Sequence, residues 1–106
     1  MSPSEVAHAF LDAAARHDVD AMLGCMTTDV VMDEPQSGVH RGAEAVRRGM
    51  ASWPRISNQK ISSETVEADV VKMQGTLDAE GYGTVSTEWK FTIAGEKITR
   101  LDVWGG

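Results

Sequence analysis

The sequence predicts an α+β fold, in which helices from the N-terminal half cover one face of a curved, mostly antiparallel sheet. Apolar residues recur at steps of three and four through the first half of the chain, and from Ile56 onward they recur at every second residue. Helices that alternated with strands would predict a parallel sheet. Here all the helical patterns precede the long run of strand patterns, which favours helices packed together on one face.

The chain of 106 residues has the size of one domain, because a single core of this size is close to the minimum for independent folding. Hydrophobic residues make up 42% and charged residues 25%, which is typical of globular proteins. We therefore expect residues 1–106 to form a single domain with one main site.

The charge balance argues against nucleic acid and anionic membranes as partners. Ten Lys and Arg against sixteen Asp and Glu give a net charge of −6, and no basic cluster exceeds the pair Arg47 and Arg48. The N-terminus lacks the pattern of a signal peptide, and no apolar run is long enough to span a bilayer. We expect a cytoplasmic protein.

The cysteine and histidines predict neither a disulfide nor a metal site. Cys25 is the single cysteine and lies among apolar residues, where a small buried side chain is the expected role. His8 and His17 are nine residues apart, which puts them on different faces of a helix. We expect no metal and no cofactor.

Three segments have the spacing of amphipathic helices: Ser4–His17 with Ser2 or Ser4 as N-cap, Asp18–Met26, and Gly42–Trp53, which Pro54 ends. The apolar residues at helical spacing are Val6, Phe10, Ala13 and Ala14 in the first segment, Val19, Met22, Leu23 and Met26 in the second, and Ala43, Val46, Met50 and Trp53 in the third.

Four strand patterns follow one another in the second half of the chain, over residues 60–68, 70–79, 83–93 and 97–104. Short turn sequences separate them, namely "AD", "EGYG" and "AGE". Strands joined in this way form an antiparallel meander.

An earlier short strand, Val30–Glu34, ends in two acids and is stopped by Pro35. Alternation puts Val30, Met32 and Glu34 on one face and Asp33 on the other. A carboxylate among apolar side chains has a raised pKa and is suited to accept and donate protons near neutral pH. The alternative is a solvated acid at the end of a strand, which is the commoner fate of a glutamate.

Three motifs in this order carry a resemblance: "HDVDAML", then "DVVMDEP" ending at Pro35, then "GAEAVR" starting at Gly42. Together with the order of elements, they resemble the nuclear-transport-factor-two-like fold, which includes ketosteroid isomerase and the SnoaL-like polyketide cyclases. The resemblance runs from about Ser4 to Arg48 and resumes at Ala94. It implies a cystatin-like cone with the three helices on the concave face of the sheet.

In the isomerase-like members the acid directly before that proline is the catalytic base, so the resemblance implies this role for Glu34. A tyrosine on the first helix of those enzymes corresponds to Phe10, which has no hydroxyl. The second hydrogen-bond donor would fall on Glu88, but alternation turns Glu88 outward, and a hairpin longer by one residue puts Thr87 there instead. We therefore expect Thr87 as a donor and do not expect steroid isomerisation itself.

SnoaL-like cyclases carry an acid late in the chain, and Asp102 is the corresponding residue here. Strand alternation, however, groups Asp102 with Arg100 and sets Leu101 and Val103 on the opposite face. If Leu101 and Val103 line the cone, Asp102 and Arg100 form an ion pair at the surface, which contributes little to the free energy of unfolding. Asp102 then serves as a second acid only if the strand bulges.

Apolar residues from helices and strands are candidates to contact a flat apolar ligand, and they would equally serve as the core of a small domain. The candidates are Phe10, Met32, Met50, Trp53, Trp89, Leu101 and Val103. We expect His17 and His40 at the surface, where His40, which is close to Glu34 in sequence, could approach the mouth of the cone.

Three functions remain open from the sequence. The first is proton transfer next to a carbonyl of an apolar small molecule, as an isomerase, cyclase or dehydratase, and it requires that Trp53 and Trp89 leave the cone open. The second is a non-catalytic ligand-binding or dimerisation module, with a homodimer formed through the polar outer face of the sheet. The third, epoxide hydrolysis, requires an Asp-Arg-Asp set inside the cone, of which Arg100 and Asp102 supply two members.

Overall fold

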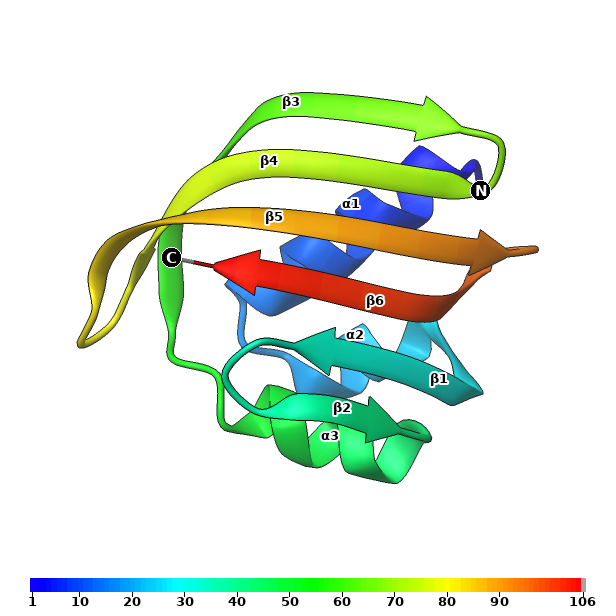
Figure 1. The fold of residues 1–106 in the computed structure, drawn as a ribbon, viewed down its shortest axis with the longest axis horizontal. Helices are drawn as coiled ribbons and strands as arrows, with labels where there is room; N and C mark the ends of the chain where they lie inside the picture. The colour runs from blue at the N-terminus through cyan, green and yellow to red at the C-terminus, as the bar shows by residue number, and fades with distance from the viewer. Residues whose placement is uncertain (106) are drawn as a thin grey trace.

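A computed structural model, which describes residues 1–105, shows three helices on one face of a curved six-stranded sheet (Figure 1). The predicted α+β class is confirmed. The helices are α1 (Pro3–Ala15), α2 (Val19–Gly24) and α3 (Ala43–Ala51). The strands are β1 (Met26–Glu34), β2 (Gly38–Arg41), β3 (Ile56–Glu67), β4 (Val70–Ala79), β5 (Gly83–Ala94) and β6 (Lys97–Gly105).

The ends of the first two helices follow from their capping residues. Ser2 caps α1 through a capping box, in which its hydroxyl accepts from the Glu5 amide at 3.2 Å and Glu5 accepts from the Ser2 amide at 2.9 Å. Asp18 caps α2 through the amide of Ala21 at 3.0 Å. The predicted extension of the second helix to Met26 is wrong, because Met26 already pairs with β6 as the first residue of β1.

The strands lie in the order β2-β1-β6-β5-β4-β3, so β3 to β6 form the predicted antiparallel meander. In addition, β1 pairs with β6 in parallel and with β2 in antiparallel fashion. The parallel pair joins the two ends of the chain in one sheet. It sets Met32 beside Leu101 on the helix side and Asp33 beside Asp102 on the other side.

Alternation along the strands divides the sheet into an apolar inner face, covered by the helices, and a polar outer face. On β5 the residues from Thr87 to Ile93 are buried at every second position, and β4 follows the same pattern from Val71 to Ala79. The core between sheet and helices contains α1 residues such as Phe10 and strand residues such as Phe91, both fully buried.

The strand β3 starts four residues earlier than predicted, at Ile56, because a bulge interrupts its pairing between Ser57 and Lys60. The close approach of the two strands there requires a glycine at position 75. A Cβ atom at Gly75 would lie 2.0 Å from the carbonyl oxygen of Lys60. This bend turns the first part of β3 down toward α3, as Figure 1 shows.

Within residues 1–105, none of the helices has the length and apolar character needed to cross a membrane.

Candidate functional site

Glu34 is the last residue of β1 and lies on the inner face of the sheet. It follows Val30 and Met32, which are both fully buried on that face, and is itself half-buried. Its neighbour Asp33 points to the outer face, where it lies 3.7 Å from Arg100. Strand alternation thus places Glu34 and Asp33 on opposite faces of the sheet in the folded chain, as predicted.

Each carboxylate oxygen of Glu34 accepts a hydrogen bond from a different element. The Ser37 hydroxyl, in the turn after β1, donates to Oε1 at 2.7 Å. The indole Nε1 of Trp53, just after α3, donates to Oε2. Donors on both oxygens hold the carboxylate in one orientation at the rim of the inner face, where β1, β2 and α3 meet.

The tryptophan that holds Glu34 is also anchored to the core. Trp53 is half-buried, and its ring packs edge to face on Phe10 with the centroids 6.3 Å apart. Phe10 in turn packs on Phe91 at 5.7 Å. The contact with Phe10 on one side of the ring helps to keep the indole N–H of Trp53 directed at Glu34.

Most of the apolar candidates are core residues rather than an open lining. Phe10, Met32, Met50 and Leu101 have no exposed surface, and Trp89 is 4% exposed. Trp53 and Val103 are only half-buried and are packed against the core from the rim. Trp89 therefore does not leave the cone open, as proton transfer inside the cone required, and Trp53 and Val103 are the members of this set that remain for ligand contact.

Thr87 lies on the inner face, as alternation predicts, and is 8% exposed. The register places Thr87 beside Gly105 on β6, one row beyond the pairing of Trp89 with Val103. Glu34 lies in the row of Val103 and Trp89, so Thr87 is two strand spacings across and two residues along from it, which is roughly 12 Å between the two positions. They lie at the same end of the sheet, because β1 and β6 run parallel and β5 starts where β6 ends.

Gln59 is a further polar residue at this end, in the bulge of β3. It is half-buried and lies between the exposed residues Asn58 and Lys60. The amide Nε2 is buried and has no hydrogen-bond partner among residues 1–105. A buried amide without a partner costs about 1–3 kcal/mol, so its retention calls for an explanation.

Asp102 lies on the outer face, so the bulge that would turn it into the cone is absent at this position. The register shift between β5 and β6 comes earlier, between Thr92 and Ile93, and pairing is regular from Arg100 to Gly105. Asp102 is mostly buried under its neighbours and accepts two bonds from Arg100 Nε at 3.2 Å and one from Nη2 at 3.1 Å. Its hydrogen bonds and charge raise the pKa of Arg100.

An Asp-Arg-Asp set does form, from Asp33, Arg100 and Asp102, but on the outer face of the sheet. The parallel pairing of β1 with β6 brings the third member, Asp33, beside Asp102. The set lies on the opposite side from Glu34 and the helices. Epoxide hydrolysis inside the cone, which requires these groups there, is therefore contradicted.

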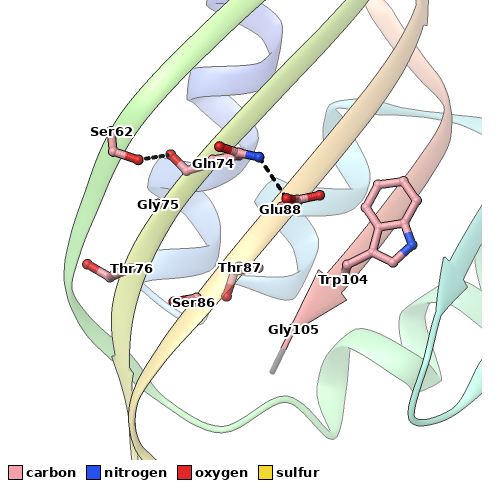
Figure 2. Close-up of a pocket in the computed structure, with 9 residues that line it drawn as sticks. All are labelled: Ser62, Gln74, Gly75, Thr76, Ser86, Thr87, Glu88, Trp104 and Gly105. Atoms are coloured by element: carbon pink, nitrogen blue, oxygen red, sulfur yellow. Dashed lines mark hydrogen bonds between the residues drawn. The ribbon is translucent and has the colours of Figure 1, made fainter.

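The outer face carries a groove of about 470 Å³ along β4, β5 and the end of β6 (Figure 2). Most of the side chains around it are polar: the Gln74 amide donates to Glu88 at 2.7 Å, and the ring of Trp104, which is 47% exposed, lies at one side. Ser62, Thr76 and Ser86 line it as well, and it is bordered by three residues at positions that alternate to the inner face, namely Gly75, Thr87 and Gly105.

Two other chemistries have no support at the rim. Among residues 1–105, no three His, Cys, Asp or Glu side chains are grouped as metal ligands would be. Cys25 is half-buried at the end of α2, and burial raises the pKa of its thiol, which disfavours the nucleophilic thiolate.

The sequence interpretation missed Ser37 and Gln59. A serine two residues after the proline of a tight turn is a common turn residue, and its spacing of three from Glu34 was the available signal. Gln59 lies before the strand as predicted, where no periodicity assigns it a face.

The chain is similar to the SnoaL-like domain family, which matches residues 7–102. No curated protein shows significant similarity to it. Among solved structures, it is similar to a cystatin-fold protein from Novosphingobium aromaticivorans, at 23% identity and a TM-score of 0.81, with 97% of each chain covered.

Two further structures share the fold. One is a protein from Sinorhizobium meliloti that is provisionally named a polyketide cyclase, at 20% identity and a TM-score of 0.82, with 93% of each chain covered. The other is TerC, co-crystallised with polyporic acid, at 18% identity and a TM-score of 0.82, covering 95% of this chain and 88% of that one.

Proposed function

This chain belongs to the SnoaL-like family, and we propose that it catalyses proton transfer next to a carbonyl of an apolar small molecule, with Glu34 as the base. The observation that carries the proposal is the carboxylate of Glu34 at the rim of the inner face, held between the Ser37 hydroxyl and the Trp53 indole. Isomerisation, cyclisation and dehydration all begin with this step.

The position of Glu34 suits a base because it joins an apolar surface to a fixed orientation. The buried Met32 precedes it on the inner face, and Val103 lies on the neighbouring strand. Two donors keep the carboxylate oriented, and a positioned base gains rate because the reacting atoms meet in one geometry. Asp33, one residue earlier, lacks this setting because it is paired with Arg100 outside.

The ligand in this proposal binds at the rim and not deep in the cone. Phe10 and Trp89 fill the interior between sheet and helices, so a deep pocket of the kind that a closed steroid site needs is occupied by side chains. The half-buried Trp53 and Val103 form the apolar surface that remains.

Stabilisation of the developing enolate oxygen falls to the polar groups of the rim. Thr87 offers a hydroxyl roughly 12 Å from Glu34 across β6. Gln59 offers a buried amide N–H₂ that has no partner among residues 1–105. A ligand that reaches both Glu34 and one of these donors is elongated, and the charge left on the deprotonated carbon reaches the oxygen at the donor only through conjugated bonds, which favours a conjugated polycyclic or biaryl carbonyl compound over a small aliphatic one.

The proposal is tested with polyporic acid and a panel of aryl ketones as probes. Ligands are first selected by a rise in melting temperature, and deuterium uptake next to the carbonyl is then followed in D₂O by proton NMR. Glu34→Gln should bind the selected ligand, but its exchange rate should fall at least about 100-fold, because a general base typically accelerates proton transfer by at least that factor. Glu44→Gln, an exposed glutamate on α3, is the matched control and should exchange at the wild-type rate. Equal rates for wild type and Glu34→Gln would refute the proposal.

A second candidate is a non-catalytic module that forms a homodimer through the outer face of the sheet. It is favoured by the groove along β4 and β5, with the exposed Trp104 beside it, and by the close filling of the inner core. The two candidates differ in whether the chain catalyses a reaction, whereas the homodimer is compatible with either, since it uses the face opposite to the rim.

A further inference from the structure

The hydroxyl of Ser37 lies between two titratable side chains. It is 2.7 Å from Oε1 of Glu34 and 2.8 Å from Nε2 of His40. All three belong to the β1–β2 hairpin, in which Glu34 pairs with Gly38 and Met32 pairs with His40. That register places the side chain of His40 on the same inner face as Glu34, with Ser37 in the turn that connects the two strands.

The imidazole of His40 is held in place by α3. A Cβ atom at Gly49 would lie 3.1 Å from Cε1 of His40 and 3.2 Å from its Nε2, so the absence of a side chain at position 49 makes room for the ring. His40 is half-buried, so part of the residue remains exposed to solvent. The ring is thus oriented by packing and is still able to exchange protons with water.

The other charged groups near His40 are directed elsewhere. Asp33 on β1 and Arg41 on β2 share the outer face, as their register with Val39 and Val31 shows. The charged residues of α3 are exposed, and one of them pairs with α2 at 2.8 Å. They are Glu44, Arg47, which bonds Asp20, and Arg48. Through Ser37, Glu34 is the carboxylate to which His40 is connected.

We propose that His40 is a positioning residue for Glu34 and receives the proton of Glu34 through Ser37; this rests on the proposed role of Glu34 as the base. With the proton on Glu34, the carboxylic acid donates to Ser37 Oγ and the Ser37 hydroxyl donates to Nε2 of His40. Oε1 then releases its proton to Ser37 Oγ while Ser37 passes its own proton to Nε2. The products are a carboxylate, an unchanged serine and an imidazolium, so atoms and charge balance.

This connection gives the base an outlet to solvent. A proton that Glu34 has taken from a ligand can pass to the half-buried His40 and from there to water, and need not return to the ligand. The hairpin therefore suits reactions in which the abstracted proton exchanges with water, such as cyclisation or dehydration, better than a transfer in which the same proton is returned.

The coupling is measurable in the protein without a ligand, through the indole resonance of Trp53. Because Trp53 donates to Glu34, the ¹H–¹⁵N shift of its Nε1 reports the protonation of that carboxylate. In a pH titration of the wild type, this shift should show one inflection from Glu34 and a second at the pH where the ring resonances of His40 titrate. Trp104, exposed on the outer face, supplies the reference indole.

Variants of Ser37 and His40 distinguish proton transfer through Ser37 from a direct effect of the nearby His40 charge on the indole shift. Ser37→Ala should lose at least half the amplitude of the second inflection, Ser37→Thr should keep it, and His40→Gln should abolish it while the Glu34 inflection stays. A wild-type titration with one inflection, or an unchanged second inflection in Ser37→Ala, overturns the proposal. Neither result depends on catalysis, so the role of Glu34 as a base would still be judged by the deuterium exchange.

Discussion

At the scale of single residues, the strand end at residues 33 and 34 shows how one position along the chain changes the chemistry of a carboxylate. Asp33 faces outward and lies beside the guanidinium of Arg100, while Glu34 faces inward and accepts bonds from Ser37 and Trp53. The two acids are adjacent in sequence. Their different surroundings follow from the pleat of β1, which turns successive side chains to opposite faces.

Gln59 provides a residue-scale test of the rim. Replacing it with leucine removes a buried amide without a partner and keeps a similar volume, so Gln59→Leu should raise the free energy of unfolding by about 1 kcal/mol or more. Urea denaturation measures this change. If the amide serves a bound ligand, the same variant should lose the rise in melting temperature caused by the selected probe. A lower free energy of unfolding for Gln59→Leu than for the wild type would contradict the inference that the Gln59 amide is buried without a hydrogen-bond partner.

At the scale of elements, polar contacts of Glu64 connect α1 to the edge strand β3. Glu64 on β3 accepts from the Ser4 hydroxyl at 2.5 Å and lies 2.7 Å from Nε2 of His8, both on α1. The hydrogen bond from Ser4, helped by His8, lowers the pKa of Glu64 below its usual 4.5. The ionised form is therefore the one that the fold stabilises.

The sign of this shift predicts a pH dependence. A carboxyl whose folded pKa is lowered contributes stability above its unfolded pKa, and that contribution is lost as the pH falls through the folded value. Glu64→Gln should reduce the free energy of unfolding by about 1 kcal/mol or less at pH 7, because the contact is partly exposed. Denaturant unfolding between pH 2 and pH 7 should show the two proteins converging at the acid end. A difference independent of pH would exclude the ionised contact as its source.

At the scale of the whole molecule, the two faces of the sheet differ in what covers them and in the residues that they carry. The helices cover the inner face, while the outer face of β4, β5 and β6 presents a polar groove and the exposed Trp104. This outer face carries both signs of charge, as in Lys90 and Glu88. A surface with both signs can pair with its own copy about a two-fold axis, which supports the proposed homodimer.

The homodimer predicts a sedimentation mass of twice 11.5 kDa at micromolar concentration. Trp104→Asp puts a charge at the edge of the groove and should shift the protein to the monomer. Tyr82→Asp is the matched control, since Tyr82 is 69% exposed in the turn between β4 and β5, away from the groove, and should leave the mass unchanged. A wild type that sediments as a monomer would refute the interface.

Much of this architecture was predictable because its signals are local. The spacing of Val6 and Phe10 predicts α1, alternation from Val85 to Ile93 predicts the buried side of β5, and Pro35 predicts the end of β1. Alternation also placed Thr87 inward and Asp102 outward. Each of these inferences uses only a few neighbouring residues, whose periodicity is fixed by the geometry of a helix or a strand.

The sequence by itself therefore determined the elements of this protein and which side of each is apolar. Only the tertiary structure decided what those sides meet: that β1 pairs with β6 and completes the outer Asp-Arg-Asp set, that Trp53 reaches Glu34, and that Ser37 connects Glu34 to His40. The reason is physical. Periodicity fixes the direction of a side chain relative to its own backbone, whereas its partner depends on how distant segments pack, and that packing leaves no local pattern in the chain.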